Sequence, residues 1–342
     1  MHPNRVAAQC LVLLFTVAAS AFQTRTVPAR TIPVPTTVSP EMQKHSTAVW
    51  QGNTETVTKT SEQWKAWIKE MDVWKLKEAV SLKERLHVTL EEKTIGGVHV
   101  YLVKPDRIPE QNRKRLLVHV HGGAYVFFGG MAATTEAILM AHYSGTEVLS
   151  IDYRMPPDYP FPAAIDDTVA VWKEVIQSYP PSKVGLFGSS AGGGLTLAMV
   201  IRLKELGLPL PGALMAGTPW ADLTKTGDTY FTNEFVDNVL GSEDGMIDAA
   251  AKLYAGSHDR KEPLISPVYG DLSGFPPTVL LSGTRDLLLS NTVRVHQKLL
   301  QSGVDARLLV FEAQSHGQYL EDDTPECAIA LGEVARFFDQ NL

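Results

Sequence analysis

The sequence predicts an α/β fold: an eight-stranded, mostly parallel sheet with helices on both faces. Short apolar runs typical of buried strands alternate with stretches of helical periodicity from residue 115 to the end of the chain. Two strand-like runs on either side of Gly96 and Gly97 come before them and indicate an antiparallel hairpin at the leading edge of the sheet. The composition suits such a domain, because 44% of the 342 residues are hydrophobic and 20% are charged.

The N-terminus, residues 1–21, is typical of a secretory signal peptide. His2 and Arg5 precede an apolar run over residues 6–19, and small residues at 19–21 suit cleavage after Ala21. The run is shorter than the roughly 20 apolar residues that a membrane span needs, so we expect no stable span once the signal is removed. A retained anchor is the alternative. The protein is therefore expected to be secreted or periplasmic.

Residues 22–40 are predicted to form an extended linker. This stretch is rich in Thr, Val and Pro, and proline lacks the backbone N–H that a helix or a central strand requires. We assign no function to this segment.

Charge and cysteine content exclude several classes of protein. The formal net charge is −7 with no basic block, which argues against a nucleic-acid partner. The two cysteines are too few for a disulfide framework. Because Cys10 falls in the predicted signal, Cys327 is expected to be free unless it pairs between chains. No residue cluster indicates a metal, and the oligomeric state stays open.

Residues 41–85 are predicted to hold N-terminal cap helices. The strongest pattern is an amphipathic helix over residues 61–80, whose apolar residues recur at helical spacing: Trp64, Trp67, Ile68, Met71 and Trp74. One interpretation is that this face packs onto the domain below. The other is that it roofs a substrate pocket, with Trp67 among the lining residues.

The catalytic domain is expected over residues 86–342. Its predicted strands are 86–93, 98–104, 115–120, 147–153, 183–187, 213–216, 278–281 and 306–311, and its predicted helices are 163–178, 195–206, 290–302 and 328–342. An insertion at about 219–270 interrupts the alternation. It has no long strand-like run, so short helices forming a second cap segment are expected there, with a structural excursion remote from the chemistry as the alternative.

The stretch 188–194 has the form of a nucleophile elbow. In a Gly-X-Ser-X-Gly turn between a strand and a helix, the backbone bends so sharply that side chains at the flanking positions would collide. Gly188 and Gly192 occupy those positions around Ser190. An ordinary glycine-rich turn is the competing interpretation, and the elbow becomes convincing only if the chain also supplies catalytic partners for Ser190.

Two residues at later strand ends supply those partners. A serine hydroxyl needs an imidazole to take its proton and a carboxylate to orient that imidazole. Asp286 follows the strand 278–281 and His316 follows the strand 306–311, so both fall at the edge where α/β sheets collect their active sites. Glu312 is the alternative acid. The rival histidines are weaker, because His296 lies in a helical pattern and His258 in the charged insertion.

A glycine pair after the strand 115–120 predicts an oxyanion hole. Backbone N–H groups aimed at the developing oxyanion each contribute roughly a hundredfold to a thousandfold in rate. Gly122 and Gly123 allow a close approach, and together with the N–H group of Ala191 they would complete the hole.

With these parts assembled, the chain resembles the hormone-sensitive-lipase family of α/β-hydrolase serine esterases. The resemblance covers about 86–342 and rests on four motifs: His121-Gly122-Gly123-Ala124, Asp152-Tyr153-Arg154, the stretch 156–167, and 188–193. It implies a serine carboxylesterase with a two-piece cap and no cofactor.

The resemblance also implies roles for individual residues. Gly123 and Ala124 stand where the family's oxyanion donors stand, and alanine replaces a glycine there without loss of the N–H. His121 and Asp152 are expected to hold loops by hydrogen bonds. Tyr125 is expected to line the substrate pocket. Ser189 is assigned to the same pocket, and the family often has an acidic residue or threonine at its position.

The sequence therefore predicts an exported esterase that cleaves small or medium acyl esters, with Ser190, His316 and Asp286 as its triad. An amidase or formamidase on the same scaffold is the nearest alternative. A ligand-binding relative without catalysis is a third, which usually lacks a triad member. Activity should fall as His316 protonates, near the ordinary histidine pKa of about 6.5.

Overall fold

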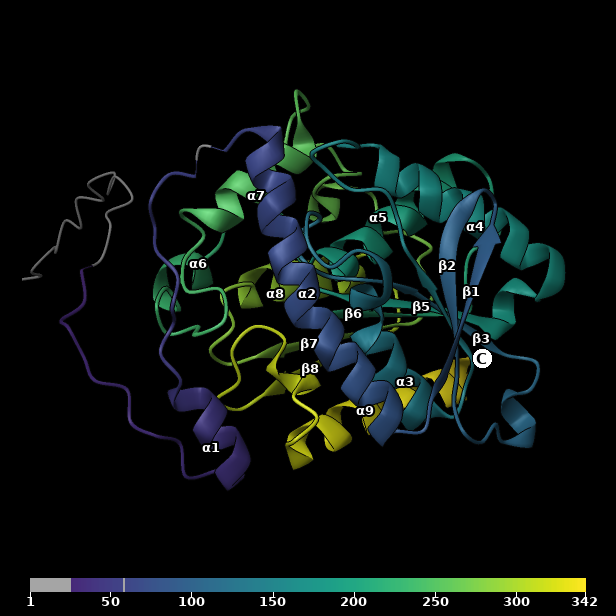
Figure 1. The fold of residues 1–342 in the computed structure, drawn as a ribbon, viewed down its shortest axis with the longest axis horizontal. Coiled ribbons are helices and arrows are strands. Elements are labelled where there is room, and N and C mark those ends of the chain that lie inside the picture. Colours follow the sequence, from purple (N-terminus) through teal and green to yellow (C-terminus); the bar gives the residue numbers. More distant parts are fainter. Residues whose placement is uncertain (1–25, 58) are drawn as a thin grey trace, which may run out of the picture. The chain divides into compact units, whose positions relative to one another are not determined.

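The sheet that the sequence predicts is present in the computed structural model, which describes residues 26–57 and 59–342. Within those residues the eight strands lie in the order β1-β2-β4-β3-β5-β6-β7-β8 (Figure 1). They are β1 Thr89–Ile95, β2 Val98–Lys104, β3 Leu116–Val120, β4 Val148–Ile151, β5 Val184–Ser189, β6 Ala213–Gly217, β7 Thr278–Gly283 and β8 Ala306–Phe311. The first two strands form the predicted antiparallel hairpin, β2 pairs antiparallel with β4, and the others run parallel.

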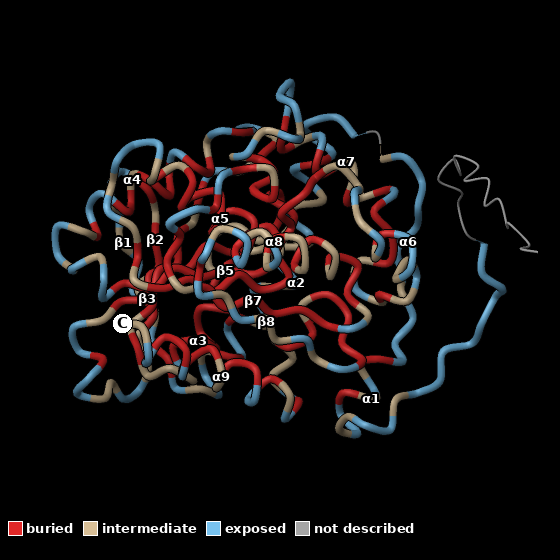
Figure 2. Tube along the Cα trace, turned by 180° about the vertical axis from the view of Figure 1, so that it is seen from behind, coloured by how far each residue is buried: buried red, intermediate tan, exposed pale blue. Residues whose placement is uncertain are grey.

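Helices cover both faces of the sheet. One face carries α4 Ala163–Ser178, α5 Ala191–Glu205 and α8 Leu289–Gln301, and the other carries α3 Thr135–Ser144 and α9 Pro325–Asn341. Each layer has its own buried apolar cluster, with Leu186 of β5 in the first and Phe187 in the second. This follows from the pleat, because neighbouring residues of a strand point to opposite faces. Figure 2 shows the central strands buried along their length.

In these layers one predicted helix boundary was wrong and one helix was not predicted. Helix α5 begins at Ala191, directly after Ser190, and so includes the glycines that the sequence pattern left in the turn. Helix α3 was not predicted. Its seven consecutive buried residues, from Thr135 to Ala141, have no amphipathic period to detect, since a helix sandwiched on several sides is apolar all round.

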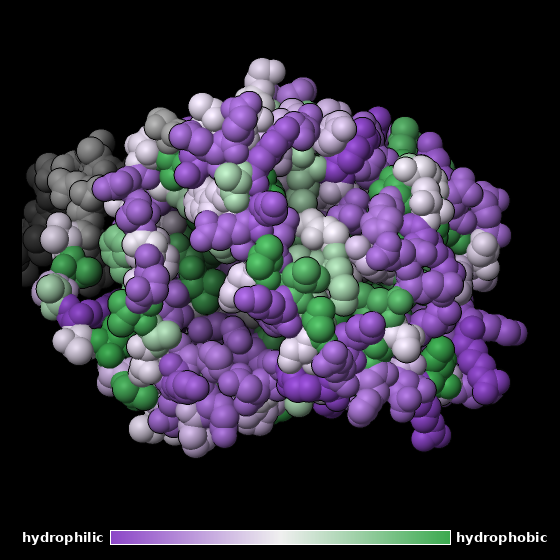
Figure 3. Space-filling view, viewed as in Figure 1, coloured by the Kyte–Doolittle hydropathy of each residue, from purple (hydrophilic) through white to green (hydrophobic). Residues whose placement is uncertain are grey.

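The N-terminal cap comprises α1 Pro40–Thr47 and α2 Ser61–Arg85. A reciprocal pair of hydrogen bonds between Thr60 and Gln63 caps the start of α2. Trp64 is buried, but Trp74 is 58% exposed, so the predicted apolar face is correct in its first half and wrong at its end. Figure 3 shows apolar surface over the second half of α2, where Val73, Trp74, Leu76 and Val80 are exposed.

The insertion between β6 and β7 contains the expected short helices, α6 Thr229–Thr232 and α7 Met246–Ala255. No strand interrupts it in the described residues. Tyr254 of α7 stacks on Tyr125, with ring centroids 3.9 Å apart, so this segment packs directly on the loop that follows β3.

The predicted linker is exposed and irregular over residues 26–34, but its end is anchored. The backbone N–H and the hydroxyl of Ser39 both donate to the carboxylate of Glu326, at the start of α9. The predicted signal, with Cys10, lies outside the described residues. Among the described helices, none has both the length and the apolar character that crossing a bilayer would require.

Candidate active site

Ser190 occupies the sharp turn between β5 and α5 that the elbow pattern predicts. Its φ of 61° lies in the left-handed region that L-residues rarely adopt. A Cβ at Gly188 or at Gly192 would overlap the carbonyl oxygen of Val120 on the neighbouring strand. Glycine at both positions therefore lets the turn pass close to β3 and hold Ser190 above the carboxyl end of the sheet.

His316 bridges Ser190 and Asp286. Its Nε2 lies 2.8 Å from Ser190 Oγ, and its Nδ1 lies 3.1 Å from Asp286 Oδ1. The acid loop follows β7 and the histidine loop follows β8, as the chain order implied. Because an ionised carboxylate only accepts hydrogen bonds, Nδ1 is assigned the proton, which leaves Nε2 free to accept the Ser190 hydroxyl.

Asp286 is completely buried and has every lone-pair direction supplied with a donor. Oδ2 accepts the hydroxyls of Thr218 and Ser282, while Oδ1 accepts the N–H of Leu288 and of the His316 ring. Burial alone would raise the pKa of Asp286, but the charge of His316 and these hydrogen bonds outweigh it and lower that pKa. The group is therefore held as a carboxylate.

The imidazole is tuned in the opposite direction. Burial by itself lowers the pKa of His316, whereas the attraction and hydrogen bond of Asp286, together with the charge of Asp237, raise it, and the net shift is upward. A site that favours the imidazolium would stabilise the charge of a His316 ring that has accepted a proton from Ser190.

Asp237 is a functional candidate that the sequence analysis missed. It belongs to the second cap segment and is fully buried beside the triad. Its Oδ2 accepts the backbone N–H of Leu287 at 2.7 Å and of His316 at 3.3 Å, so one carboxylate fixes both catalytic loops. Burial and the nearby Asp286 raise the pKa of Asp237. No motif or periodicity marks it, since its neighbours in the sequence carry no regular pattern.

The loop after β3 presents backbone N–H groups beside Ser190. Gly123 has a φ of 105° and Ala124 a φ of 53°, so the chain turns through conformations that expose its amides. In the described part of the protein, no acceptor is bonded to the N–H groups of Gly123, Ala124 or Ala191. Gly122 sits against Ser190, where a side chain would contact the serine Cβ. These donors can serve an oxyanion.

His121 and Asp152 hold this loop, as expected. His121 Nδ1 donates to the carbonyl of Gly122 at 2.7 Å, and since a trans peptide directs its N–H opposite to its C=O, the N–H of Gly123 points away from the ring. Burial lowers the pKa of His121 to about 4, which keeps it neutral. Asp152 Oδ1 accepts the N–H of Gly130 at 2.8 Å further along the loop.

Helix α2 supports the same loop from above. Asp72 Oδ1 accepts the N–H of Phe128 at 2.7 Å, and Trp67 meets Phe127 edge-on at 5.2 Å between ring centroids. The N-terminal cap therefore contacts the oxyanion loop through both a charged hydrogen bond and an aromatic contact.

The three predicted pocket residues have different environments. Tyr125 is 1% exposed and packs between α7 and α5, so its observed contacts are those of a core residue. Trp67 lines a cavity of about 700 Å³ together with Val57, Lys59 and Gln63, and no triad residue lines that cavity. Ser189 is placed incorrectly by the prediction: its hydroxyl points into a buried polar network with Glu136 and Tyr319. The pleat turns it away from the Ser190 side.

The alternative catalytic groups lie apart from Ser190. Glu312 is exposed, His296 is bonded to the carbonyl of Ala306, and His258 pairs with Glu262. Cys327 is buried without a disulfide, and burial raises its pKa to about 12, so its thiol stays protonated.

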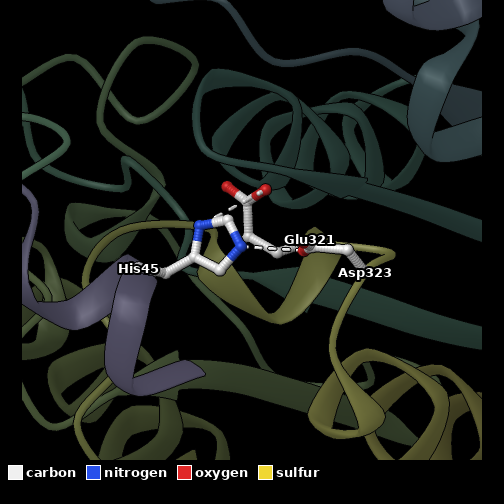
Figure 4. A group of neighbouring side chains, drawn as sticks. All are labelled: His45, Glu321 and Asp323. Carbon is white, nitrogen blue, oxygen red and sulfur yellow. Dashed lines mark hydrogen bonds and ion pairs between the residues drawn. The ribbon is translucent and has the colours of Figure 1, made fainter. Parts of the chain in front are cut away.

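One cluster in the described residues has metal-ligand chemistry: His45, Glu321 and Asp323 (Figure 4). His45 Nε2 lies 2.7 Å from Asp323, and Nδ1 lies 4.0 Å from Glu321. The two ring nitrogens thus face different carboxylates, and a single ion could bind only one of them. The hydrogen bond between His45 and Asp323 joins α1 to the loop after His316.

Comparisons with known proteins identify the fold and the class of enzyme. The family described as the alpha/beta hydrolase fold matches residues 117–320. An acetyl-hydrolase of Streptomyces hygroscopicus is 34% identical over 211 residues, 61% of this chain and 69% of that protein. The crystal structure of an esterase, E25, has a TM-score of 0.90 at 44% identity and covers 93% of this chain and 99% of its own. An esterase from the bacterial hormone-sensitive lipase family has a TM-score of 0.72 at 28% identity, covering 89% and 98%.

Proposed function

This chain belongs to the α/β-hydrolase family and is a carboxylic ester hydrolase of the hormone-sensitive-lipase type, and we propose that it is an exported serine esterase for small to medium acyl esters. Ser190, His316 and Asp286 are its proposed triad. No cofactor enters the proposed reaction.

In this mechanism Ser190 Oγ attacks the ester carbonyl while His316 Nε2 takes its proton. The tetrahedral oxyanion accepts hydrogen bonds from the N–H groups of Gly123, Ala124 and Ala191. His316 then gives the proton to the leaving alkoxide, so that the alcohol departs and Ser190 carries the acyl group. A water molecule, deprotonated by His316, attacks that acyl-enzyme, and the acid leaves as Ser190 regains its proton.

One observation carries the proposal: His316 Nε2 lies 2.8 Å from Ser190 Oγ while Nδ1 faces the buried Asp286 carboxylate. With the proton on Nδ1, this orientation leaves Nε2 free to act as a base towards the serine. An ordinary glycine-rich turn would not require a serine hydroxyl at hydrogen-bond distance from His316 Nε2.

A preference for short acyl groups is supported by two features. A similar protein is named an acetyl-hydrolase. In addition, Ala124 stands where the family pattern has glycine, and we infer that its methyl group leaves less room on the acyl side of the reacting carbonyl. The amidase alternative uses the same residues and differs only in the leaving group.

Export is proposed from the sequence of residues 1–21, which lie outside the described part of the chain. The experiment for it is expression of the full chain followed by mass spectrometry of its N-terminus. A mature chain that begins at Phe22 in the exported fraction supports export, and an intact N-terminus in the cell fraction contradicts it.

The activity is tested with matched p-nitrophenyl ester and anilide substrates and an acyl series from acetate to laurate. We expect hydrolysis of the esters, highest for the short chains, and labelling of Ser190 by a fluorophosphonate. Ser190→Ala should lose both. An unlabelled folded protein contradicts the proposed nucleophile, and faster cleavage of the anilide favours the amidase.

A further inference from the structure

Behind the nucleophile turn lies a buried chain of polar side chains that the proposed mechanism does not use. Its members come from five elements far apart in the sequence, and we call them the back-face network: His119 of β3, Glu136 of α3, Ser150 of β4, Ser189 of β5 and Tyr319 of the turn Gln318–Leu320. All five are buried. They lie on the face of the sheet covered by α3 and α9, where Phe187 also points.

We propose that Ser189, Glu136 and Tyr319 are positioning residues for ester hydrolysis, because their hydrogen-bonded chain ties the turn that carries Ser190 to the loop that carries His316. This inference rests on the proposed function. It adds three residues that contact neither the substrate nor the reacting atoms, and act only through the placement of Ser190 and His316.

The hydrogen bonds run in one consistent direction. Ser189 Oγ lies 2.6 Å from Glu136 Oε1 and 2.6 Å from the Tyr319 hydroxyl. Since a serine has one proton, it donates to the carboxylate and must accept from the tyrosine. Burial and the Glu136 charge raise the pKa of Tyr319, which keeps that proton on the phenol.

The other end of Glu136 is held from the sheet. His119 Nε2 lies 3.2 Å from Glu136 Oε2, and His119 Nδ1 lies 2.9 Å from Ser150 Oγ. With Nε2 as donor, Nδ1 accepts the Ser150 hydroxyl. The carboxylate therefore has a donor on each oxygen and cannot shift towards either without losing a bond to the other, and a buried bond lost in this way is costly.

The two ends of this hydrogen-bonded chain explain how it would affect the reaction. Ser189 is the residue before Ser190, and Tyr319 comes three residues after His316. Apart from the direct contact between Oγ and Nε2, this hydroxyl pair is the side-chain bond in the described residues that joins the two catalytic segments directly. The Ser189–Tyr319 bond lies on the opposite face of the sheet from the Ser190–His316 contact. Together the two contacts fix the separation and the angle between the two segments.

The sheet makes room for this pair. Gly217, at the end of β6, is the strand partner of Ser189. A Cβ at Gly217 would overlap both the Tyr319 hydroxyl and Ser189 Oγ. A glycine at this buried strand position costs conformational entropy, and here it lets the two hydroxyls meet.

The test compares Ser189→Ala, Tyr319→Phe and the double variant on a short-chain p-nitrophenyl ester. Rates are normalised to the concentration of active sites titrated with a fluorophosphonate, so a poorly folded fraction does not enter kcat. Each single variant should lower kcat about tenfold with KM changed less than about twofold, since misplacement by about 1 Å of reacting groups costs up to a hundredfold. The double variant should be no slower than the slower single one.

Tyr230→Phe is the matched control. Its hydroxyl is equally buried and also makes two bonds, to the Asp222 carbonyl and to Asn291, but they lie in the second cap segment and α8. It should leave kcat unchanged even if the melting temperature falls. Glu136→Leu provides a further variant, because it removes the acceptor of both Ser189 and His119, and it should lower kcat in the same way.

The inference is overturned if titrated Ser189→Ala and Tyr319→Phe keep the wild-type kcat, if only KM changes, or if the losses in the double variant multiply. A wild-type protein that hydrolyses no ester and takes no label would instead refute the proposed function, and the two failures are therefore distinguishable.

Discussion

At the scale of single residues, His316 lies between two buried carboxylates of different origin. Asp286 is hydrogen-bonded to the ring, and Asp237 reaches the backbone N–H of His316 from the second cap segment. These are the charged groups that raise the pKa of the imidazole against its burial. The acidic limb of the activity profile should therefore reflect both.

The first prediction concerns that limb. A base must be neutral, so kcat/KM should fall as the pH drops through the pKa of His316 in the free enzyme. Because that pKa is raised, the midpoint should lie above the ordinary value of about 6.5. A profile of kcat/KM from pH 5 to 9 measures it. A midpoint below pH 6 would contradict the assigned environment.

The second prediction separates Asp237 from Asp286. Asp237→Asn removes a negative charge beside the imidazole. Its amide oxygen can still accept the two loop N–H groups, although the N–H groups of Val239 and Leu240 then lose their acceptor, Oδ1. The acidic limb should then move to lower pH, with kcat on the plateau reduced less than about tenfold. Asp244→Asn, an exposed change in the same segment, is the control and should leave the limb in place. An unmoved limb in Asp237→Asn would show that the carboxylate only supports the loops.

Single residues also mark the limits of sequence reasoning. Ser190, Asp286 and His316 could be predicted because each follows a recognisable strand and parallel strands end at one edge of the sheet. Asp237 could not be, since its place depends on how an irregular segment folds back. Ser189 was assigned to the pocket because it adjoins Ser190, but the pleat of β5 directs it to the opposite face.

At the scale of elements, α2 and the loop after β3 behave as one unit. The loop contains several residues at positive φ, among them Ala124, Tyr125 and Phe128, and such a backbone needs support from its surroundings. Asp72 provides one hydrogen bond to it, and the aromatic contact of Trp67 with Phe127 provides packing. The contacts of α2 are therefore packing contacts with the loop after β3. If α2 also roofs a pocket, it does so through this same loop.

The third prediction tests this support. Asp72→Ala removes the acceptor for the Phe128 N–H, which should loosen the loop and lower kcat about tenfold, as the loss of one oxyanion donor costs a hundredfold or more. Asp72→Asn keeps an acceptor oxygen and should recover most of the rate. Turnover on a short-chain ester measures the effect. Equal rates for Asp72→Ala and the wild type would show that the loop holds its shape without α2.

Elements with a clear period were predicted closely, and those without one were not. Helix α4 begins and ends at the predicted residues, 163 and 178. The apolar face of α4 packs on the sheet, and its polar face is turned to solvent. Helix α3 lies between the sheet, α2 and α9, so its sequence lacks a polar face that would set the period.

At the scale of the whole molecule, the segment from Ser39 to Trp50 reaches the surroundings of the triad. The backbone carbonyls of His45 and Ala48 accept the side chain of Asn238, next to Asp237. Arg285, the neighbour of Asp286, donates to the carbonyl of Ser46. Trp50 packs on Phe235, with ring centroids 5.7 Å apart. This short N-terminal segment thus supports the cap and the acid loop together.

The fourth prediction follows from these contacts. A chain that begins at Val34 keeps α1 and should retain full activity and stability. A chain that begins at Lys59 keeps α2 but loses the contacts of α1 and Trp50, and its kcat should fall severalfold together with its melting temperature. Activity per titrated site and thermal unfolding provide the measurements. Equal behaviour of the two shortened chains would mean that the segment only covers the surface.

The sequence by itself determined the layered α/β fold, the positions of its strands along the chain and the catalytic Ser, Asp and His candidates. These depend on local patterns, namely apolar runs, turn glycines and residues that directly follow a strand. Only the tertiary structure decided which side chains meet from segments without a pattern. Asp237, Asp72 and the Ser189–Glu136–Tyr319 chain depend on the path of the cap and on the packing of α3, because contacts between distant segments are fixed by the shape of the core and leave no period in the sequence.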